Sequence, residues 1–77
     1  MKITVKFHAS LKKYAGGGEN GVVALDIPPM NVAKLIDYLG INRLDVGIIV
    51  INGVRGGYLS DIHDDDQIQL FTELKGG

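Results

Sequence analysis

The start of the chain alternates strictly between apolar and polar side chains, and this period of two restricts the fold more than any other feature. From residue 2 to residue 9 the apolar set is Ile3, Val5, Phe7 and Ala9, and the polar set is Lys2, Thr4, Lys6 and His8. Because successive side chains of a β-strand point to opposite faces, the pattern predicts a strand with one buried face. Such a strand needs neighbouring strands and a layer that covers its apolar face.

The covering layer is predicted between residues 32 and 39, where apolar side chains recur at the spacing of an α-helix. They form a single stripe, made of Val32, Leu35, Ile36 and Leu39. Asn31 suits the N-cap because its side chain can accept from a free backbone N–H of the first turn. Gly40 suits the left-handed position that ends a helix. A helix with one apolar stripe is expected to pack on one face of one sheet.

The other strands are predicted from apolar runs bounded by turn residues. Val22 to Ile27 is the expected hairpin partner of the first strand, and it stops at Pro28-Pro29 because proline has no N–H for the ladder. A strand covered on both faces is expected at Ile48–Ile51, and a tight turn follows at Asn52-Gly53. A weak edge strand is expected at Val54–Leu59, and the last strand at Gln67–Lys75. This order predicts an α+β protein of the β-grasp type, with the first and last long strands adjacent and parallel.

Length and composition exclude several classes of function. A chain of 77 residues predicts one domain, spanning 1–77. Cysteine is absent, so Cys-based zinc sites and thiol nucleophiles are excluded. A net charge of −1 argues against a nucleic-acid binder, and no apolar run approaches the roughly 20 residues of a membrane span. We therefore expect a cytoplasmic protein that binds neither nucleic acid nor membrane.

The acidic residues near the end of the chain are interpreted as a solvated turn. Asp61, Asp64, Asp65 and Asp66 are the right residue type for calcium, but they lack the order of an EF-hand loop and its closing glutamate. His8 and His63 are expected at the surface, without a catalytic role. No metal site is therefore predicted.

Four segments spread along the chain are similar to segments of one protein family. Val5–Leu11 is a strand that leads to an Ala-x-Leu turn, and Asn31–Gly40 is a helix. Val50–Gly53 is a strand with its turn, and Asp64–Gly77 is an acidic turn followed by the last strand and Gly-Gly. In these segments the chain resembles the MoaD/ThiS family, which contains the small subunit of molybdopterin synthase and the sulfur carrier of thiamin biosynthesis. Thr72-Glu73 stands where molybdopterin-type members commonly carry prolines, and Asp64-Asp65-Asp66 stands where Asp-Gly-Asp is common.

The resemblance implies a ubiquitin-like sulfur carrier that is not itself an enzyme. In this family an E1-like adenylating enzyme uses MgATP to convert the carboxylate of the last glycine, here Gly77, into an acyl adenylate. A sulfide or persulfide donor then displaces AMP and leaves a C-terminal thiocarboxylate. The carrier binds no cofactor of its own, and it passes the sulfur to the large subunit of a synthase or to another acceptor. Molybdopterin biosynthesis, for the molybdenum or tungsten cofactor, is the pathway that the resemblance favours.

The last residues have the composition that such chemistry requires. Leu74, Lys75, Gly76 and Gly77 are expected to form a flexible tail, and the two glycines lack the Cβ atoms that would hinder entry into a narrow tunnel. Four extended residues span about 13 Å, which is enough to reach another protein's active site. Phe71 falls on the strand parity opposite to Ile68 and Leu70. If it is exposed, it would form an apolar docking residue beside the tail, and the alternative is a residue at the edge of the core.

Three functions stay open at this stage. The first is the small subunit of a molybdopterin-type synthase, and the related thiamin-pathway carrier shares its chemistry. The second is a protein modifier in which Gly77 is joined to a lysine of a target protein. The third is an interaction module whose Gly76-Gly77 end has no chemical role. The choice of substrate between the first two lies in the partner proteins, so the sequence leaves them unseparated.

Overall fold

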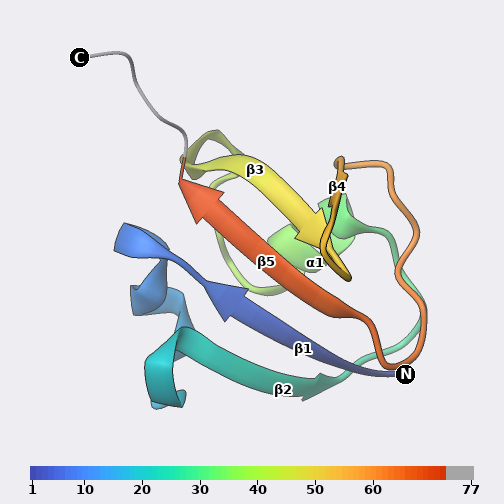
Figure 1. Cartoon of the computed structure of the whole chain (residues 1–77), viewed down its shortest axis with the longest axis horizontal. Helices are drawn as coiled ribbons and strands as arrows, with labels where there is room; N and C mark the ends of the chain where they lie inside the picture. The colour runs from blue at the N-terminus through green and yellow to red at the C-terminus, as the bar shows by residue number, and fades with distance from the viewer. Residues whose placement is uncertain (73–77) are drawn as a thin grey trace.

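One mixed β-sheet and one α-helix dominate the structure, a computed structural model that describes residues 1–72 (Figure 1). The five strands are β1 Lys2–Phe7, β2 Val22–Asp26, β3 Val46–Ile51, β4 Val54–Gly56 and β5 Gln67–Thr72. They lie in the order β2-β1-β5-β3-β4. The central strands β1 and β5 are parallel, and the other neighbours are antiparallel. The predicted fold class, with the first and last long strands adjacent and parallel, is confirmed.

The first strand ends earlier than its alternating pattern predicts. Ile3, Val5 and Phe7 are buried as expected, but Ala9 is exposed, so the prediction that Ala9 lies on the core face is wrong. The amide of His8 donates to the carbonyl of Leu70 (3.0 Å), and the chain then turns at Ala9, whose φ is +53°. A 3₁₀ helix, η1 Ala9–Ala15, follows and places Leu11 in the core, where it is 1% exposed.

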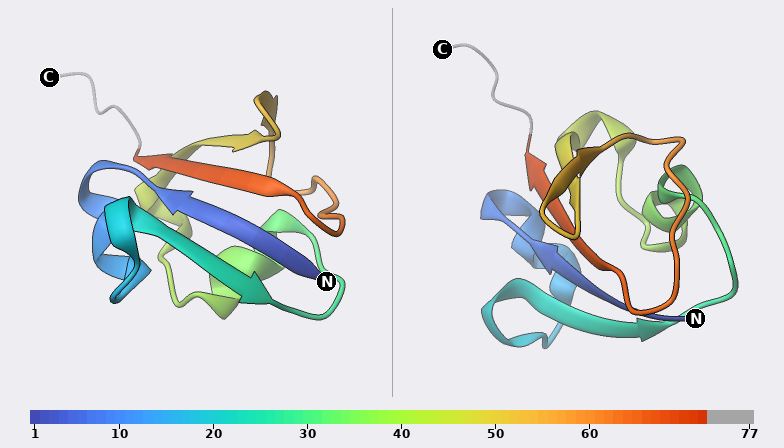
Figure 2. Two further views of the ribbon diagram at one scale, coloured as in Figure 1. Left: turned by 60° about the horizontal axis from the view of Figure 1, so that its bottom comes forward. Right: turned by 45° about the vertical axis from the view of Figure 1, so that its right-hand side comes forward.

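The helix α1, Val32–Tyr38, has the caps that the sequence predicts. The side-chain oxygen of Asn31 accepts from the backbone N–H of Lys34 at 3.0 Å, which satisfies one of the free donors of the first turn. Gly40 has a φ of +74° and ends the helix in the left-handed region. The helix lies against one face of the sheet and leaves the opposite face uncovered among residues 1–72 (Figures 1 and 2).

The core fills the space between α1 and the inner face of the sheet. Phe7 and Leu35 are both 0% exposed, so the prediction that they are core residues is confirmed. The largest fully buried side chains come from β1, η1, α1 and β5; they are Val5, Phe7, Leu11, Val32, Leu35, Ile36, Ile68 and Leu70. Leu39, the last member of the predicted helical stripe, is half-buried and packs against this cluster.

The strand β3 is longer and less buried than predicted. It follows a short 3₁₀ helix, η3 Arg43–Asp45, and starts at Val46. Within 48–51 only Ile49 is fully buried, so the prediction of a strand covered on both faces is wrong. The reason is that α1 covers one face only, and Ile48 and Val50 have the parity of the other face. The predicted turn is confirmed, with positive φ at Asn52 (+51°) and Gly53 (+81°), and the edge strand β4 is only three residues long.

One member of the acidic turn is buried, contrary to the prediction of a solvated turn. Asp66 is 7% exposed, and its carboxylate accepts from the side-chain N–H of Asn52 and from the backbone N–H of His63, both at 2.8 Å. Asn52 in turn accepts from the backbone N–H of Gln67 at 2.9 Å. The hydrogen bond from His63, followed by that from Asn52, holds the pKa of Asp66 below its ordinary value of 3.8 against the opposing effect of burial. This network ties the β3–β4 turn to the start of β5.

Within the part of the chain that the structure describes, no helix is long and apolar enough to cross a membrane. A third 3₁₀ helix, η2 Glu19–Gly21, connects the glycine-rich segment after η1 to β2. The glycine-rich segment from Gly16 to Gly21 therefore includes an ordered turn at its end.

The first stability prediction concerns Leu35, at the centre of the helix–sheet interface. Replacing it with alanine removes a fully buried side chain and leaves a cavity, so Leu35→Ala should lower the free energy of unfolding by about 2–5 kcal/mol. Leu44→Ala is the matched control, because Leu44 is 77% exposed and the same truncation there should change stability by less than about 0.5 kcal/mol. Urea unfolding measures both. An unchanged midpoint for Leu35→Ala would contradict the packing of α1.

A second prediction concerns acid and Asp66. Its pKa is lowered in the folded state, so its contribution to stability is complete above the unfolded pKa and is lost as the pH falls through the folded pKa. Asp66→Asn should therefore be less stable than the parent at neutral pH, and the difference should shrink as the pH falls below 3.8. The neighbouring Asp65→Asn is the control, since it leaves the Asp66 network intact and should keep the parent's acid-dependent loss. Thermal melts between neutral and acid pH measure this. If the stability difference between Asp66→Asn and the parent were the same at every pH, the ionised carboxylate of Asp66 would not be the stabilising species.

Candidate docking surface

The face of the sheet opposite α1 carries a cluster of apolar side chains near the end of β5. Phe71 lies opposite Ile48 on β3, and Val50 lies opposite Gln69. All three apolar side chains are half-buried and have the parity that points away from the core. We call Ile48, Val50 and Phe71 the outer patch. This face is turned toward the viewer in Figure 1, with α1 behind the sheet.

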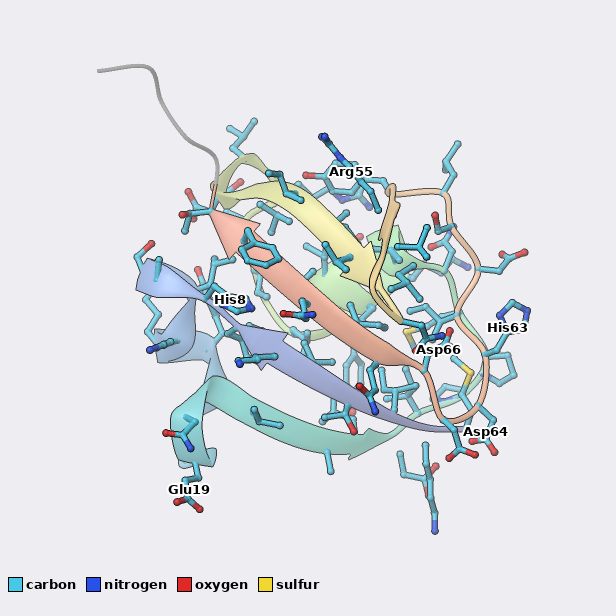
Figure 3. All side chains as sticks on the ribbon, in the orientation of Figure 1. His8, Glu19, Arg55, His63, Asp64 and Asp66 are labelled. Atoms are coloured by element: carbon cyan, nitrogen blue, oxygen red, sulfur yellow. The ribbon has the colours of Figure 1, made fainter. Side chains whose placement is uncertain are left out.

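Phe71 is held in place by a histidine from the neighbouring segment. The rings of His8 and Phe71 are parallel, with an interplanar angle of 5° and centroids 4.0 Å apart. His8 also donates a hydrogen bond from Nε2 to the side-chain oxygen Oε1 of Gln69, at 2.9 Å. The predicted surface position of His8 is therefore correct only in part, because the ring is half-buried against β5. Figure 3 shows His8 at the end of β1, beside β5. The stacking orients Phe71 without removing it from the surface.

Basic side chains flank the outer patch on both sides. Lys6 of β1 lies opposite Gln69, and Arg55 of β4 lies opposite Val50, so one row across the sheet reads Lys6, Gln69, Val50, Arg55. Both basic residues are exposed. The acidic residues Asp64 and Asp66 lie at the far end of β5, well away from His8 (Figure 3). The patch thus has an apolar centre and a positively charged rim.

The outer patch lies at the end of the described part of β5. Phe71 is the second-last residue of β5, which ends at Thr72. The predicted tail residues Leu74, Lys75, Gly76 and Gly77 lie outside the described residues, so their conformation and roles stay predictions. Of the site residues predicted from the sequence, Phe71 is the one whose position the structure describes. It is neither a core residue nor fully exposed.

Sequence reasoning missed three members of this surface. His8 was expected at the surface without a catalytic role, and Ile48 and Val50 were expected to lie in a strand covered on both faces. The signal that could have found them is parity: once β3 is paired with β5, Ile48 and Val50 must share a face with Phe71. That pairing joins segments far apart in the chain, so local patterns do not reveal it.

Other parts of the described surface offer weaker candidates. A shallow depression of about 520 Å³ lies between β1 and β2 at the opposite end of β5 from Thr72, and it is lined by Lys2, Thr4, Ala24, Asp26 and Gln67 among others. Within residues 1–72 no group of three or more His, Asp or Glu side chains is placed to hold a metal ion. The ion pair of Asp37 with Arg43 (2.7 Å) is exposed; the hydrogen bond lowers the pKa of Asp37, and the pair lies at the end of α1.

Comparison with known proteins finds similarity in structure alone. No protein-family profile and no curated protein matches the sequence. A Pyrococcus furiosus protein provisionally named molybdopterin converting factor, subunit 1, superposes with a TM-score of 0.70 at 19% identity, covering 95% of this chain and 98% of that one. SAMP1 from Haloferax volcanii gives 0.72 at 20% identity over the full length of both chains. Urm1 from Trypanosoma brucei gives 0.70 at 21% identity, over 99% of this chain and 95% of that one.

These similarities establish the fold of the part of the chain that the structure describes. The order and pairing of the strands and the position of α1 agree with the ubiquitin-like β-grasp architecture of these neighbours. The fold predicted from the sequence resemblance is therefore confirmed. Fold alone does not assign a function, because the same architecture carries different chemistries.

The outer patch generates a prediction that separates folding from binding. Phe71→Ala should keep the fold, with a loss of roughly 0.5–1.5 kcal/mol from the ring stacking with His8. It should weaken binding to the adenylating enzyme that the sequence resemblance implies about tenfold or more, because interface aromatics carry a large share of binding energy. Titration calorimetry and thermal melts measure the two effects.

Leu59→Ala is the matched control for the loss of an exposed apolar side chain. Leu59 is 84% exposed and does not belong to the outer patch, so binding should stay at the parent's affinity. Parental affinity in Phe71→Ala, or a stability loss as large as that of Leu35→Ala, would rule out a docking role for Phe71.

Proposed function

We propose that this chain is a sulfur carrier whose C-terminal Gly77 is adenylated by a partner enzyme and converted to a thiocarboxylate. The observation that carries the proposal is the combination of the β-grasp sheet with the Gly76-Gly77 pair. The pair follows the central strand β5, separated from it only by Glu73, Leu74 and Lys75. Two neighbours in structure, the Pyrococcus furiosus and Haloferax volcanii proteins, support a carrier or modifier class by their names.

The proposed chemistry needs a free carboxylate and little else from the chain. The carboxylate of Gly77 attacks the α-phosphorus of ATP, forming the acyl adenylate and releasing pyrophosphate. A sulfide ion then attacks the acyl carbon, and AMP leaves with the electron pair of the broken C–O bond, which gives the thiocarboxylate directly. If the donor is a protein persulfide, the same attack gives an acyl disulfide. A thiol of the donor then attacks the donor-side sulfur, forms a disulfide with it and releases the thiocarboxylate. The adenylating enzyme supplies the magnesium ion and the groups that stabilise the phosphate charge. The carrier itself is proposed to be non-catalytic, and its use of MgATP-dependent partners is consistent with a cytoplasmic location.

The outer patch supplies the recognition that this chemistry requires. Its apolar centre and the basic rim of Lys6 and Arg55 suit a partner surface with an apolar centre and acidic side chains around it. Phe71 lies at the end of β5, so a partner bound there is also close to the base of the tail. The adenylating enzyme and the sulfur acceptor would bind this surface in turn, because both must receive the same tail.

The acceptor that we propose is the large subunit of a molybdopterin-type synthase, in the biosynthesis of the molybdenum or tungsten cofactor. The name of the Pyrococcus furiosus neighbour favours it. The alternative is a protein modifier joined through Gly77 to a lysine of a target, and the name "small archaeal modifier protein 1" of a Haloferax volcanii neighbour favours that use. A sulfur carrier of the thiamin pathway is a further alternative, and it would use the same thiocarboxylate chemistry as the molybdopterin-type carrier. Intact mass separates carrier from modifier, since exchange of one oxygen for sulfur and formation of an isopeptide change the mass differently.

The decisive prediction is that Gly77 acts only through its free carboxylate. Deleting Gly77, or adding one alanine after it, should leave the melting temperature unchanged, because the core that the structure describes is formed by residues from Ile3 to Leu70. Both variants should lose AMP transfer and thiocarboxylate formation, because the reacting group is displaced and an error of about 1 Å can cost roughly 100-fold. Adenylation assays and intact mass with a cognate activating enzyme measure this.

A substitution at Gly76 provides the steric test. Gly76→Trp keeps the length of the chain but adds a side chain that a narrow tunnel would exclude. Its adenylation and thiocarboxylate formation should therefore fall nearly as far as those of the chain without Gly77. Lys12→Trp is the control for an added aromatic, because Lys12 is exposed in η1. Full activity of the chain with the added alanine would refute the carrier function.

A further inference from the structure

The strand β2 forms one free edge of the sheet. It is the first strand in the order β2-β1-β5-β3-β4, so no strand of residues 1–72 lies on its other side. In Figure 2 it runs along the margin of the sheet. An edge strand presents unpaired N–H and C=O groups, which can pair with a strand of another molecule.

The pairing of β2 with β1 shows which backbone groups point outward. Met1 and Ile27 exchange two hydrogen bonds, from the Met1 ammonium to the Ile27 carbonyl (2.6 Å) and from the Ile27 amide to the Met1 carbonyl (2.9 Å). Hydrogen-bonded and non-bonded pairs alternate along an antiparallel ladder. The next bonded pairs are therefore Ile3 with Leu25 and Val5 with Val23. It follows that residues 22, 24 and 26 direct their backbone groups to the open edge.

These outward groups are complementary to a second copy of themselves. The Val22 amide is already used, because it donates to the Glu19 carbonyl. The Val22 carbonyl and both backbone groups of Ala24 and of Asp26 remain directed outward. The turn at Gly18 lies close to the Val22 oxygen, since a Cβ at position 18 would be 2.5 Å from it, and only a glycine there leaves room beside that oxygen. In an antiparallel pairing centred on Ala24, each Ala24 amide meets the other Ala24 carbonyl, and each Asp26 amide meets the other Val22 carbonyl.

The side chains of β2 also lack the usual protection of an edge. Natural edges are blunted by lysine, proline, bulges or short length. The opposite edge follows this rule, because β4 has three residues and carries Arg55. In contrast, β2 has five residues, VVALD, with no lysine or proline and with a regular register against β1. Its single charge, Asp26, lies 3.6 Å from the N-terminal ammonium.

We propose that two copies of this chain associate through β2, forming one continuous antiparallel sheet with its two-fold axis at Ala24. The small exposed side chains of the two Ala24 residues meet on the outer face. On the inner face Val23 of one copy lies opposite Leu25 of the other, and both are half-buried apolar residues that extend the core. Val22 faces Asp26 across the axis, so no like charges are opposed. The hydrogen bonds between the two copies are all made by backbone groups. A second copy pairs with every outward-directed group of β2 except the Asp26 carbonyl.

The proposed dimer leaves the docking surface free. The outer patch belongs to β3 and β5, and β1 separates β5 from the paired edge. A two-fold axis perpendicular to the sheet keeps both outer faces on the same side, with both α1 helices on the other. The dimer would therefore present two outer patches on one surface. This inference rests on β2 alone and stands whether or not the proposed function is correct.

The test uses Ala24→Pro, which removes an outward N–H while every hydrogen bond between β2 and β1 is retained. Proline is tolerated on an edge strand where its missing N–H would face solvent. Sedimentation velocity of the full chain over increasing concentration should show a monomer–dimer equilibrium for the parent. Its dissociation constant should rise at least about tenfold in the variant, because two symmetric hydrogen bonds are lost. In the parent, exchange of the Ala24 amide should slow as the concentration increases.

Two further variants keep the test decisive if the proline perturbs β2. Ala24→Lys places like charges opposite each other at the axis and should weaken association, while its melting temperature stays near that of the parent because Ala24 is exposed. Leu59→Lys makes the same change of charge on a remote exposed residue and should dimerise like the parent. A monomeric parent at millimolar concentration, or equal dimerisation of Ala24→Lys, overturns the proposal. A monomeric parent whose binding to an adenylating enzyme is weakened by Ala24→Lys also overturns it and assigns the edge to that enzyme.

Discussion

The two central strands come from opposite ends of the described chain and pair in parallel, with Val5 opposite Ile68 and Phe7 opposite Leu70. All four side chains are buried, and α1 packs against them through Leu35. Parallel neighbours cannot be joined by a tight turn, so the chain between them must cross over the sheet. That crossover contains α1 and the β3–β4 hairpin. The position of the helix, the strand order and the free outer face all depend on this one pairing.

The alternation of β5 lets one strand serve two faces. Ile68 and Leu70 complete the core, and Gln69 and Phe71 extend the outer face. A shift of one residue would exchange these sets, so the register has to be held firmly. The buried carboxylate of Asp66 does this at the start of the strand, through Asn52 and the amide of His63. The carbonyl of Asp66 also accepts from Thr4 of β1 at 3.0 Å. The hydrogen bonds of Asp66 at the start of β5 therefore hold the register that places Phe71, near the end of the strand, on the outer face.

The two edges of the sheet differ in a way that fits the proposed roles of the β2 edge and the outer patch. β4 is short and charged, which protects the side of the sheet nearest the outer patch from pairing with other strands. β2 is longer and uncharged over most of its length, and it is farthest from the patch. Association through β2 and docking through Phe71 would then be independent. A carrier that must release one partner before it meets the next would benefit from a docking face that its own self-association leaves open.

The sequence by itself determined the long strands, the helix and most of the core, because these follow from local spacing. Alternation identified β1 and β5, and the stripe with its Asn31 and Gly40 caps identified α1 to within one residue. Phe7, Leu35 and the parity of Phe71 followed from the same patterns. Tertiary structure alone decided the outer patch and the burial of Asp66. His8, Ile48 and Phe71 belong to three segments, and Asp66 is satisfied by Asn52 from another turn. These groups meet only after distant strands have paired, and hydrogen bonds and contacts between distant strands leave no periodic trace in the sequence.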